Sequence, residues 1–471
     1  MTGFSLATWI GFVISFVSAP ISTRLFSPDQ LGRINLFNIG VNLLLALSLL
    51  GLDQALVRFY YEPPSRTNKK YLLSILTLVS TLVLLFGGLI IVLFFWRPVS
   101  FSIIESHNQL IVICLVLSSI SAVVLRYLNL FYRLEQKILW FNIQAILIAI
   151  FTRVLYLGTG FWSPTYMPAI LVLTGTNLLL MISFLLIQRK EFEVIKNLPD
   201  KNFVKTIAAF AVPLIPVTVI AWVNNSVSAL VISRLLNFAE VAIFTVAASL
   251  AGLVSIIQAG FNTYWAPYVY QNYKENSHRF WIIHKLIACC LTLFGLMIIL
   301  LQEPAFMLLG EKYRGAVLFF PFLLIAPICY TLGETTGIGI NIAKKTYWSP
   351  IILISSILAN IVICLTLIPL IGISGAAIAS AFAGIVSVIL KTVIGRKYYT
   401  HITSYKYLVI TIILLVVASF IGYVFVDNRI LKHILLSLIL LLGIYIYRKE
   451  IVILLKNVCD IVKAMTHKPN P

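Results

Sequence analysis

Fourteen long apolar runs constrain the fold of this chain more than any other feature of its sequence. Each has about twenty mainly apolar residues, the length that an α-helix needs to cross a bilayer. Of the 471 residues 60% are hydrophobic and only 11% are charged, whereas soluble domains have roughly 25% charged residues. Soluble multidomain and disordered chains are therefore excluded. The runs predict an all-α integral membrane protein with spans at 4–25, 34–56, 71–95, 109–130, 138–160, 166–188, 205–233, 240–265, 280–301, 316–340, 348–369, 374–394, 406–426 and 432–447.

The basic residues predict which way these helices face. Lys and Arg number 35 against 16 Asp and Glu, a formal charge of +19, and 26 of the 35 fall in the termini and connections on one side. Because basic loops stay in the cytoplasm, we expect both termini to be cytoplasmic. The positive charge is therefore assigned to topology and to anionic membrane lipids, and no nucleic-acid partner is expected.

An internal repeat predicts how the spans are grouped. The segment 18–25 aligns with 228–235, 210 residues later, and each copy ends a first helix with Arg before a second helix begins. Short apolar stretches can align by chance, but both copies occupy the same place in their half. The repeat predicts two six-helix bundles related by a pseudo-two-fold axis along the membrane normal. The expected parts are bundles at 1–188 and 205–400, a cytoplasmic linker at 189–204, two extra helices at 401–447 and an amphipathic tail at 448–471.

Signatures of enzymes are missing from the sequence. It contains no Walker loop, no G-x-S-x-G elbow and no H-E-x-x-H pair, and its histidines and cysteines lack metal-ligand spacing. We therefore expect neither catalytic residues nor a metal site.

Ionisable residues within the spans carry most of the functional information, because burying them is costly. Basic side chains outnumber acids there, so a cavity between the two halves is expected to suit an anionic ligand held by Arg–phosphate contacts. Two amides in the seventh span offer hydrogen bonds to sugar hydroxyls. The candidate substrate-binding residues are Arg24, Arg58, Arg126, Arg153, Arg234, Asn224 and Asn225.

Each of these residues also has a structural interpretation. Arg58, Arg126 and Lys391 could anchor their helices by snorkelling to the cytoplasmic interface. Arg24 and Arg234 could cap helix C-termini, and the two amides could bond neighbouring helices. Arg153 lies too deep for comfortable snorkelling and favours a cavity-facing role.

Three segments resemble one family of transporters. They are Arg24–Gly32 (RLFSPDQLG), Gly337–Thr346 (GIGINIAKKT), and Asn360 with Leu367–Ala379 (LIPLIGISGAAIA). These patterns are similar to those of Wzx-type polysaccharide repeat-unit flippases, in the multidrug/oligosaccharidyl-lipid/polysaccharide exporter superfamily. In the third segment Pro and Gly are expected to form a tight outer turn, and small residues to let span twelve pack closely.

The resemblance implies a V-shaped exporter in a bacterial cytoplasmic membrane. Such a protein would move undecaprenyl-pyrophosphate-linked oligosaccharide units from the cytoplasmic to the outer leaflet by alternating access. The resemblance also implies coupling to H⁺ or Na⁺, for which Asp53 and Glu334 are the deep acids available; Glu334 could equally be a paired structural carboxylate. No other cofactor is expected, and it stays open whether other polysaccharide-assembly proteins take part.

Three alternatives remain at the sequence level. Peptidoglycan-precursor flippases of the same superfamily are not separable by these motifs. A drug or cation antiporter of that superfamily would favour an acidic interior, whereas this one is basic. A membrane-embedded glycosyltransferase or polymerase would need a sizeable outer loop, and the expected outer connections are short.

Overall fold

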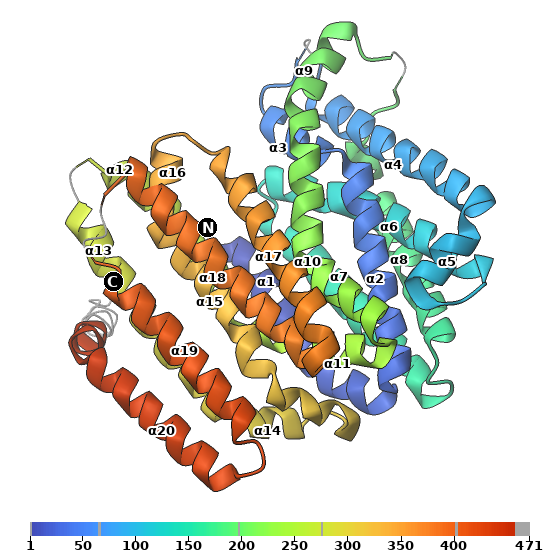
Figure 1. The fold of residues 1–471 in the computed structure, drawn as a ribbon. Helices are drawn as coiled ribbons and strands as arrows, with labels where there is room; N and C mark the ends of the chain where they lie inside the picture. The colour runs from blue at the N-terminus through green and yellow to red at the C-terminus, as the bar shows by residue number, and fades with distance from the viewer. Residues whose placement is uncertain (1, 65–66, 196–197, 275–276, 401–403, 457–471) are drawn as a thin grey trace, which may run out of the picture. The chain divides into compact units, whose positions relative to one another are not determined.

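A computed structural model describes the chain except for residues 1, 65–66, 196–197, 275–276, 401–403 and 457–471. Within the described residues all regular structure is helical (Figure 1). The first half holds α1 (Thr2–Leu25), α2 (Pro28–Leu49), α3 (Leu52–Phe59), α4 (Lys69–Phe94), α5 (Trp96–Ile104), α6 (Gln109–Leu134), α7 (Ile138–Val154), η2 (Leu155–Phe161), α8 (Tyr166–Gln188) and η3 (Arg189–Glu191). There follow α9 (Lys201–Ala211), η4 (Val212–Leu214), α10 (Ile215–Leu235), α11 (Phe238–Ala251), α12 (Val254–Asn272), α13 (Ser277–Leu300), α14 (Gln302–Met307), η5 (Glu311–Leu318), α15 (Phe320–Thr336), α16 (Ile338–Ile342), α17 (Trp348–Ile371), α18 (Ile373–Tyr398), α19 (Lys406–Val424) and α20 (Arg429–Ile446).

The predicted all-α membrane fold is confirmed, but the count of fourteen spans is not. Eleven helical segments of the described chain are long and apolar enough to cross a membrane, or twelve with the pair η5 and α15, which is bent by 60°. Of the remaining two predicted spans, 4–25 coincides with α1, and the run at 240–265 is divided between α11 and α12.

The second predicted span, 34–56, is also interrupted. Leu50 and Gly51 take left-handed backbone angles, φ 49° and 73°, so α2 ends at Leu49 and α3 begins at Leu52. A Cβ atom on Gly51 would lie 2.6 Å from the carbonyl oxygen of Ala211 at the end of α9. The break therefore depends on a residue without a side chain, at the point where a second segment crosses.

The helix boundaries support the repeat register. The helices α1 and α10 end at Leu25 and Leu235, and α2 and α11 begin at Pro28 and Phe238, each pair 210 positions apart. The side-chain nitrogen of Asn35 also donates a hydrogen bond of 2.7 Å to the hydroxyl of Thr245, its own repeat equivalent. Contact between equivalent residues is what a two-fold axis between α2 and α11 produces.

The chain forms two compact units, the first of residues 1–246 with 309–313 and the second of residues 247–308 with 314–471. In the first unit a buried cluster joins α2, α3, α4, α6 and α9 around Leu56, Tyr60, Leu72 and Tyr127. In the second unit α18 packs against α15 and α17. A Cβ atom on Gly375 would lie 2.6 Å from the backbone of Leu367, so the predicted close packing of span twelve is confirmed.

The division into bundles at 1–188 and 205–400 stays a prediction, as do the linker and the two extra helices as separate parts. Of the predicted amphipathic tail, residues 448–456 are helical and the rest lie outside the described residues.

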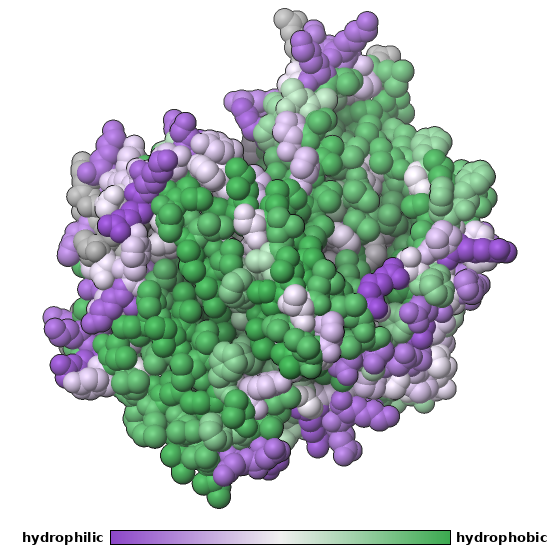
Figure 2. All heavy atoms as spheres, in the orientation of Figure 1, coloured by the Kyte–Doolittle hydropathy of each residue, from purple (hydrophilic) through white to green (hydrophobic). Residues whose placement is uncertain are grey.

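The surface suits a lipid environment. Figure 2 shows hydrophobic residues over most of the visible face, with hydrophilic residues gathered mainly where helices end. Large apolar side chains such as Phe86 and Phe94 of α4 are 65% and 74% exposed. A patch of this extent on a soluble protein would be a liability, whereas on a membrane protein it faces acyl chains.

Candidate functional site

The break after α2 places an acidic side chain opposite an arginine of α6. Asp53 lies in the first turn of α3, where the positive end of the helix dipole favours a carboxylate. Its Oδ2 atom is 3.1 Å from Nη2 of Arg126 and accepts a hydrogen bond of 3.0 Å from Gln54. The Asp53 side chain is 5% exposed and that of Arg126 is 46% exposed, so the acid is enclosed while the base reaches outward.

A second acid–base pair lies in the second unit. The Oε1 atom of Glu334 on α15 is 2.8 Å from Nζ of Lys391 on α18, and the two side chains are 29% and 24% exposed. A Cβ atom on Gly333 would lie 2.9 Å from Cδ of Lys391, so the glycine makes room for the lysine chain. Both acids predicted for ion coupling are thus next to a base, and Lys391 is more than a membrane anchor.

The other predicted arginines are exposed. Arg24 and Arg234 lie in the last turns of α1 and α10, where the helix dipole favours a cation. Nη2 of Arg234 is 3.4 Å from the carbonyl oxygen of Ser102. Arg58 pairs with Glu62 at 3.4 Å, and both are largely exposed. Arg153, in the last turn of α7, forms no hydrogen bond or ion pair within the described part of the chain.

The predicted amides and arginines do not form one cluster. Asn224 is half-buried and Asn225 exposed on α10. Among the predicted site residues only Asp53 and Arg126 are in direct contact within the described structure. Arg24, Arg58, Arg153, Arg234 and the two amides all belong to the first unit, and Glu334 belongs to the second.

Sequence reasoning missed an arginine in the second turn of α2. Arg33 forms an ion pair of 3.1 Å with Asp29, donates to the carbonyl oxygen of Ile104, and lies 4.3 Å from the ring centre of Phe238. The four-residue spacing of Asp29 and Arg33 on a helix was the signal that could have found the pair. Its partners come from α2, α5 and α11, so its role is to join helices.

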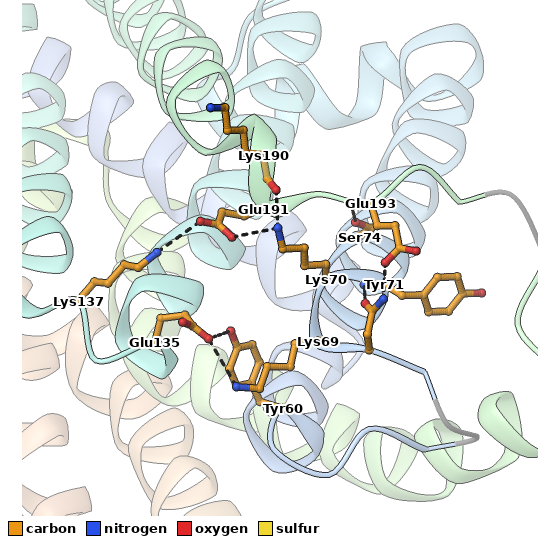
Figure 3. A network of polar contacts seen from close by, with 11 residues as sticks. Tyr60, Lys69, Lys70, Tyr71, Ser74, Glu135, Lys137, Lys190, Glu191 and Glu193 are labelled. Carbon is orange, nitrogen blue, oxygen red and sulfur yellow. Dashed lines mark hydrogen bonds and ion pairs between the residues drawn. The ribbon is translucent and has the colours of Figure 1, made fainter.

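A network of charged residues joins three connections at one end of the first unit (Figure 3). Lys69 pairs with Glu135 at 3.6 Å, and Lys70 and Lys137 pair with Glu191 at 3.7 and 3.3 Å. Figure 3 shows the Lys70 ammonium also reaching the backbone carbonyl of Lys190, at 2.7 Å, while the side chain of Lys190 points away.

Further hydrogen bonds complete this network. The hydroxyl of Tyr60 donates to Glu135 at 2.6 Å, and Asn68 donates to Glu193 at 2.6 Å. The Tyr60 hydrogen bond, then the Lys69 charge, hold the pKa of Glu135 below its ordinary value although burial opposes this. Burial, followed by the same hydrogen bond, raises the pKa of Tyr60. Three lysines counted in the topology are thus paired with two acids, Lys70 and Lys137 sharing Glu191.

Polar contacts also tie α20 to its neighbours in the second unit. Lys432, which is 3% exposed, pairs with Glu303 of α14. At the other end the hydroxyls of Thr292, Thr411 and Tyr447 link α13, α19 and the end of α20. Among the residues described, no group of three or more His, Cys, Asp or Glu could hold a metal ion.

Comparison with solved structures identifies the fold. The fold is similar to that of the structure described as lipid II flippase MurJ in an inward closed conformation, with a TM-score of 0.70 and 15% identity over 98% of this chain and 100% of that one. An inward-facing multidrug resistance MATE transporter has a TM-score of 0.54 at 14% identity, covering 83% of this chain and 97% of that one. The Vibrio cholerae MATE transporter VcmN, as a D35N mutant, has the same TM-score and identity, covering 84% of this chain and 98% of that one.

The fold is therefore that of a multi-pass membrane transporter of the flippase and exporter type, and not of an enzyme. The polysaccharide biosynthesis protein family matches residues 3–273, more than half of the chain, and the chain belongs to that family. No protein of curated function matches this sequence. The solved structures that share this fold are described as a flippase and as transporters, so the glycosyltransferase and polymerase alternative is not supported.

Proposed function

We propose that this protein flips undecaprenyl-pyrophosphate-linked oligosaccharide units from the cytoplasmic to the outer leaflet of a bacterial cytoplasmic membrane, for the assembly of a surface polysaccharide. It works by alternating access, driven by an ion gradient, with both termini in the cytoplasm. One observation carries the proposal: a chain of the polysaccharide biosynthesis family has, over 98% of its length, the fold of a protein described as a lipid II flippase.

The distribution of charge in the first unit supports an anionic cargo. Arg24, Arg153 and Arg234 carry exposed guanidinium groups without an acidic partner among the described residues. A guanidinium has five N–H donors in a planar fork that matches phosphate oxygens. These arginines with Arg58 and Arg126 are proposed to hold the diphosphate or acidic sugars, and Asn224 and Asn225 to bond sugar hydroxyls.

Ion coupling is assigned in this proposal to Glu334. Its carboxylate is 29% exposed, against 5% for Asp53, so H⁺ or Na⁺ can reach it more readily. A cation there would compete with the Lys391 ammonium for the same oxygens. Substitution of Glu334 by Gln is expected to make flipping in vesicles insensitive to the imposed H⁺ or Na⁺ gradient.

A drug or cation antiporter is the second candidate, because MATE transporters share the fold. A cationic drug needs an available carboxylate, but Asp53 and Glu334 are each within 3.1 Å of a base. The observed pairs therefore favour the anionic cargo.

Deletion of the gene tests the proposal. We expect loss of a surface polysaccharide, with lipid-linked oligosaccharide accumulating on the inner leaflet. Drug sensitivity with normal polysaccharide would instead support the antiporter. In complementation, Arg153→Ala should lower export about tenfold, as expected for the loss of a charged hydrogen bond. Arg97→Ala, an exposed arginine outside the proposed set, should not.

A further inference from the structure

We propose that Asp53 is a positioning residue that holds Arg126 for the diphosphate of the cargo, and that it does not carry the coupling ion. This inference rests on the proposed function, and it gives Asp53 and Arg126 one shared task, the binding of the diphosphate. It begins from the 3.1 Å contact between Nη2 of Arg126 and Oδ2 of Asp53.

The surroundings hold Asp53 in place. The left-handed residues Leu50 and Gly51 end α2, so Asp53 falls in the first turn of a new helix rather than in the middle of a continuous one. Gln54 donates to the same oxygen as Arg126, at 3.0 Å. A buried carboxylate is tolerated only with such partners, and here they leave Asp53 5% exposed.

The helix that carries Arg126 is equally well fixed. Val123 and Tyr127 beside it on α6 are fully buried, and the Tyr127 hydroxyl lies 2.8 Å from that of Ser80 on α4. The backbone of Arg126 is thus rigidly placed, and the Asp53 contact restrains its long side chain.

The pair is asymmetric in a way that suits a ligand. One Nη atom of Arg126 contacts Asp53, and the described structure gives the guanidinium no other hydrogen bond or ion pair. Because the arginine side chain is 46% exposed, its remaining N–H donors are accessible to a ligand. A guanidinium held from behind by a carboxylate presents a preformed fork, and loses less conformational freedom on binding a phosphate.

The assignment makes Asp53 an unsuitable site for the coupling ion. An ion there would have to reach a carboxylate that is 5% exposed and compete for it with Arg126 and Gln54. It would thereby weaken the contact that holds the Arg126 side chain. Glu334, which is more exposed, has no such second partner on its carboxylate in the described structure.

The test uses the full-length protein in vesicles, with undecaprenyl pyrophosphate bearing a short fluorescent oligosaccharide as the probe. Flipping rates against probe concentration give KM and the maximal rate. Asp53→Ala should raise KM about tenfold, close to the effect of Arg126→Ala, with the maximal rate within about twofold. The double variant should be no worse than Arg126→Ala, because the two residues act as a unit.

Two further variants separate positioning from other roles. Asp53→Asn keeps an acceptor for Arg126, so it should raise KM less than Asp53→Ala and should retain the response to an ion gradient. This variant also tests the proposal if Asp53→Ala does not fold. Asp29→Asn removes the carboxylate of the Arg33 pair, which lies outside the proposed binding set, and should leave KM unchanged.

Several outcomes would overturn the inference. Effects that multiply in the double variant would show that the two residues act separately. A lowered maximal rate with unchanged KM would indicate a merely structural pair. Loss of the gradient response in Asp53→Asn would make Asp53 the coupling residue. If the wild-type protein does not flip the probe at all, the proposed function itself fails, which is distinct from failure of the variant pattern.

Discussion

At Gly51 the backbone has a φ of 73°, and a Cβ atom would lie 2.6 Å from the carbonyl oxygen of Ala211. Both facts oppose any side chain, since positive φ is costly for other residues and the crossing backbone leaves no room. Gly51→Ala should therefore destabilise the protein by about 1–3 kcal/mol. The melting temperature of the purified protein in detergent measures this.

Gly87 of α4 is the matched control. A Cβ atom there would meet nothing within 4 Å, and the residue is helical. Gly87→Ala should leave the melting temperature unchanged or raise it, because alanine favours helices. Equal effects at the two positions would contradict the account of the break.

The ionisation of Glu135 is expected to make the stability of the fold depend on pH. The Tyr60 hydrogen bond and the Lys69 charge hold its pKa below the ordinary 4.5. A lowered folded-state pKa stabilises the fold above the unfolded value, and this contribution is lost as the pH falls through the folded value. The melting temperature should therefore fall as the pH drops below about 4.5.

Tyr60→Phe provides the comparison, because it removes the hydroxyl that donates to Glu135. The variant should melt at a lower temperature at neutral pH and lose less on acidification. An acid profile parallel to that of the wild type would show that other carboxylates dominate.

Among the elements, α2 and α11 make a contact between repeat-equivalent residues, Asn35 and Thr245. If the two halves rock during flipping, this contact opens and closes. On a cysteine-free background, Asn35→Cys with Thr245→Cys should form a disulfide on oxidation. Flipping should stop, and reductant should restore it.

A protease site in the connection around residues 189–200 makes the cross-link visible. After cleavage the two fragments should stay together on a non-reducing gel only when both cysteines are present. Asn35→Cys alone is the control. A cross-linked protein that still flips at the wild-type rate would show that the contact stays closed throughout the cycle.

The positions of the helices could be predicted, whereas their interruptions could not. A spanning segment must satisfy its own backbone hydrogen bonds, so an apolar run of sufficient length implies a helix. The break at Leu50 and Gly51 depends on Ala211, far along the chain. The pairing of Asp53 with Arg126, 73 residues apart, depends likewise on tertiary packing. The repeat register makes Asn35 and Thr245 equivalent positions, but their contact likewise depends on packing.

For the whole molecule, the excess of Lys and Arg on one side predicts cytoplasmic termini. On a cysteine-free background, Asp427→Cys in the connection before α20 should react with a membrane-impermeant maleimide in intact cells. Thr346→Cys, before α17, should react only after the membrane is opened. Both native side chains are exposed, so access to the reagent depends on the side of the membrane. The reverse pattern would invert the topology.

In the candidate site, too, the composition of the spans predicts the charge of the ligand, whereas packing decides which side chains meet. The basic excess in the spans pointed to an anionic cargo, and the family match agrees with a role in polysaccharide assembly. The sequence does not show which base pairs with which acid, because these pairs join residues far apart in the chain. Lys391 contacts Glu334 by packing against Gly333, which precedes the lysine by 58 positions.

The bond between Asn35 and Thr245 has one more consequence. In a symmetric homodimer, a residue on the two-fold axis meets an identical copy of itself, so the position must suit a side chain that pairs with its own kind. Here both copies lie in one polypeptide, and the two positions can differ. The chain uses that freedom to set an amide donor against a hydroxyl acceptor, and each side can then vary without forcing the same change on the other.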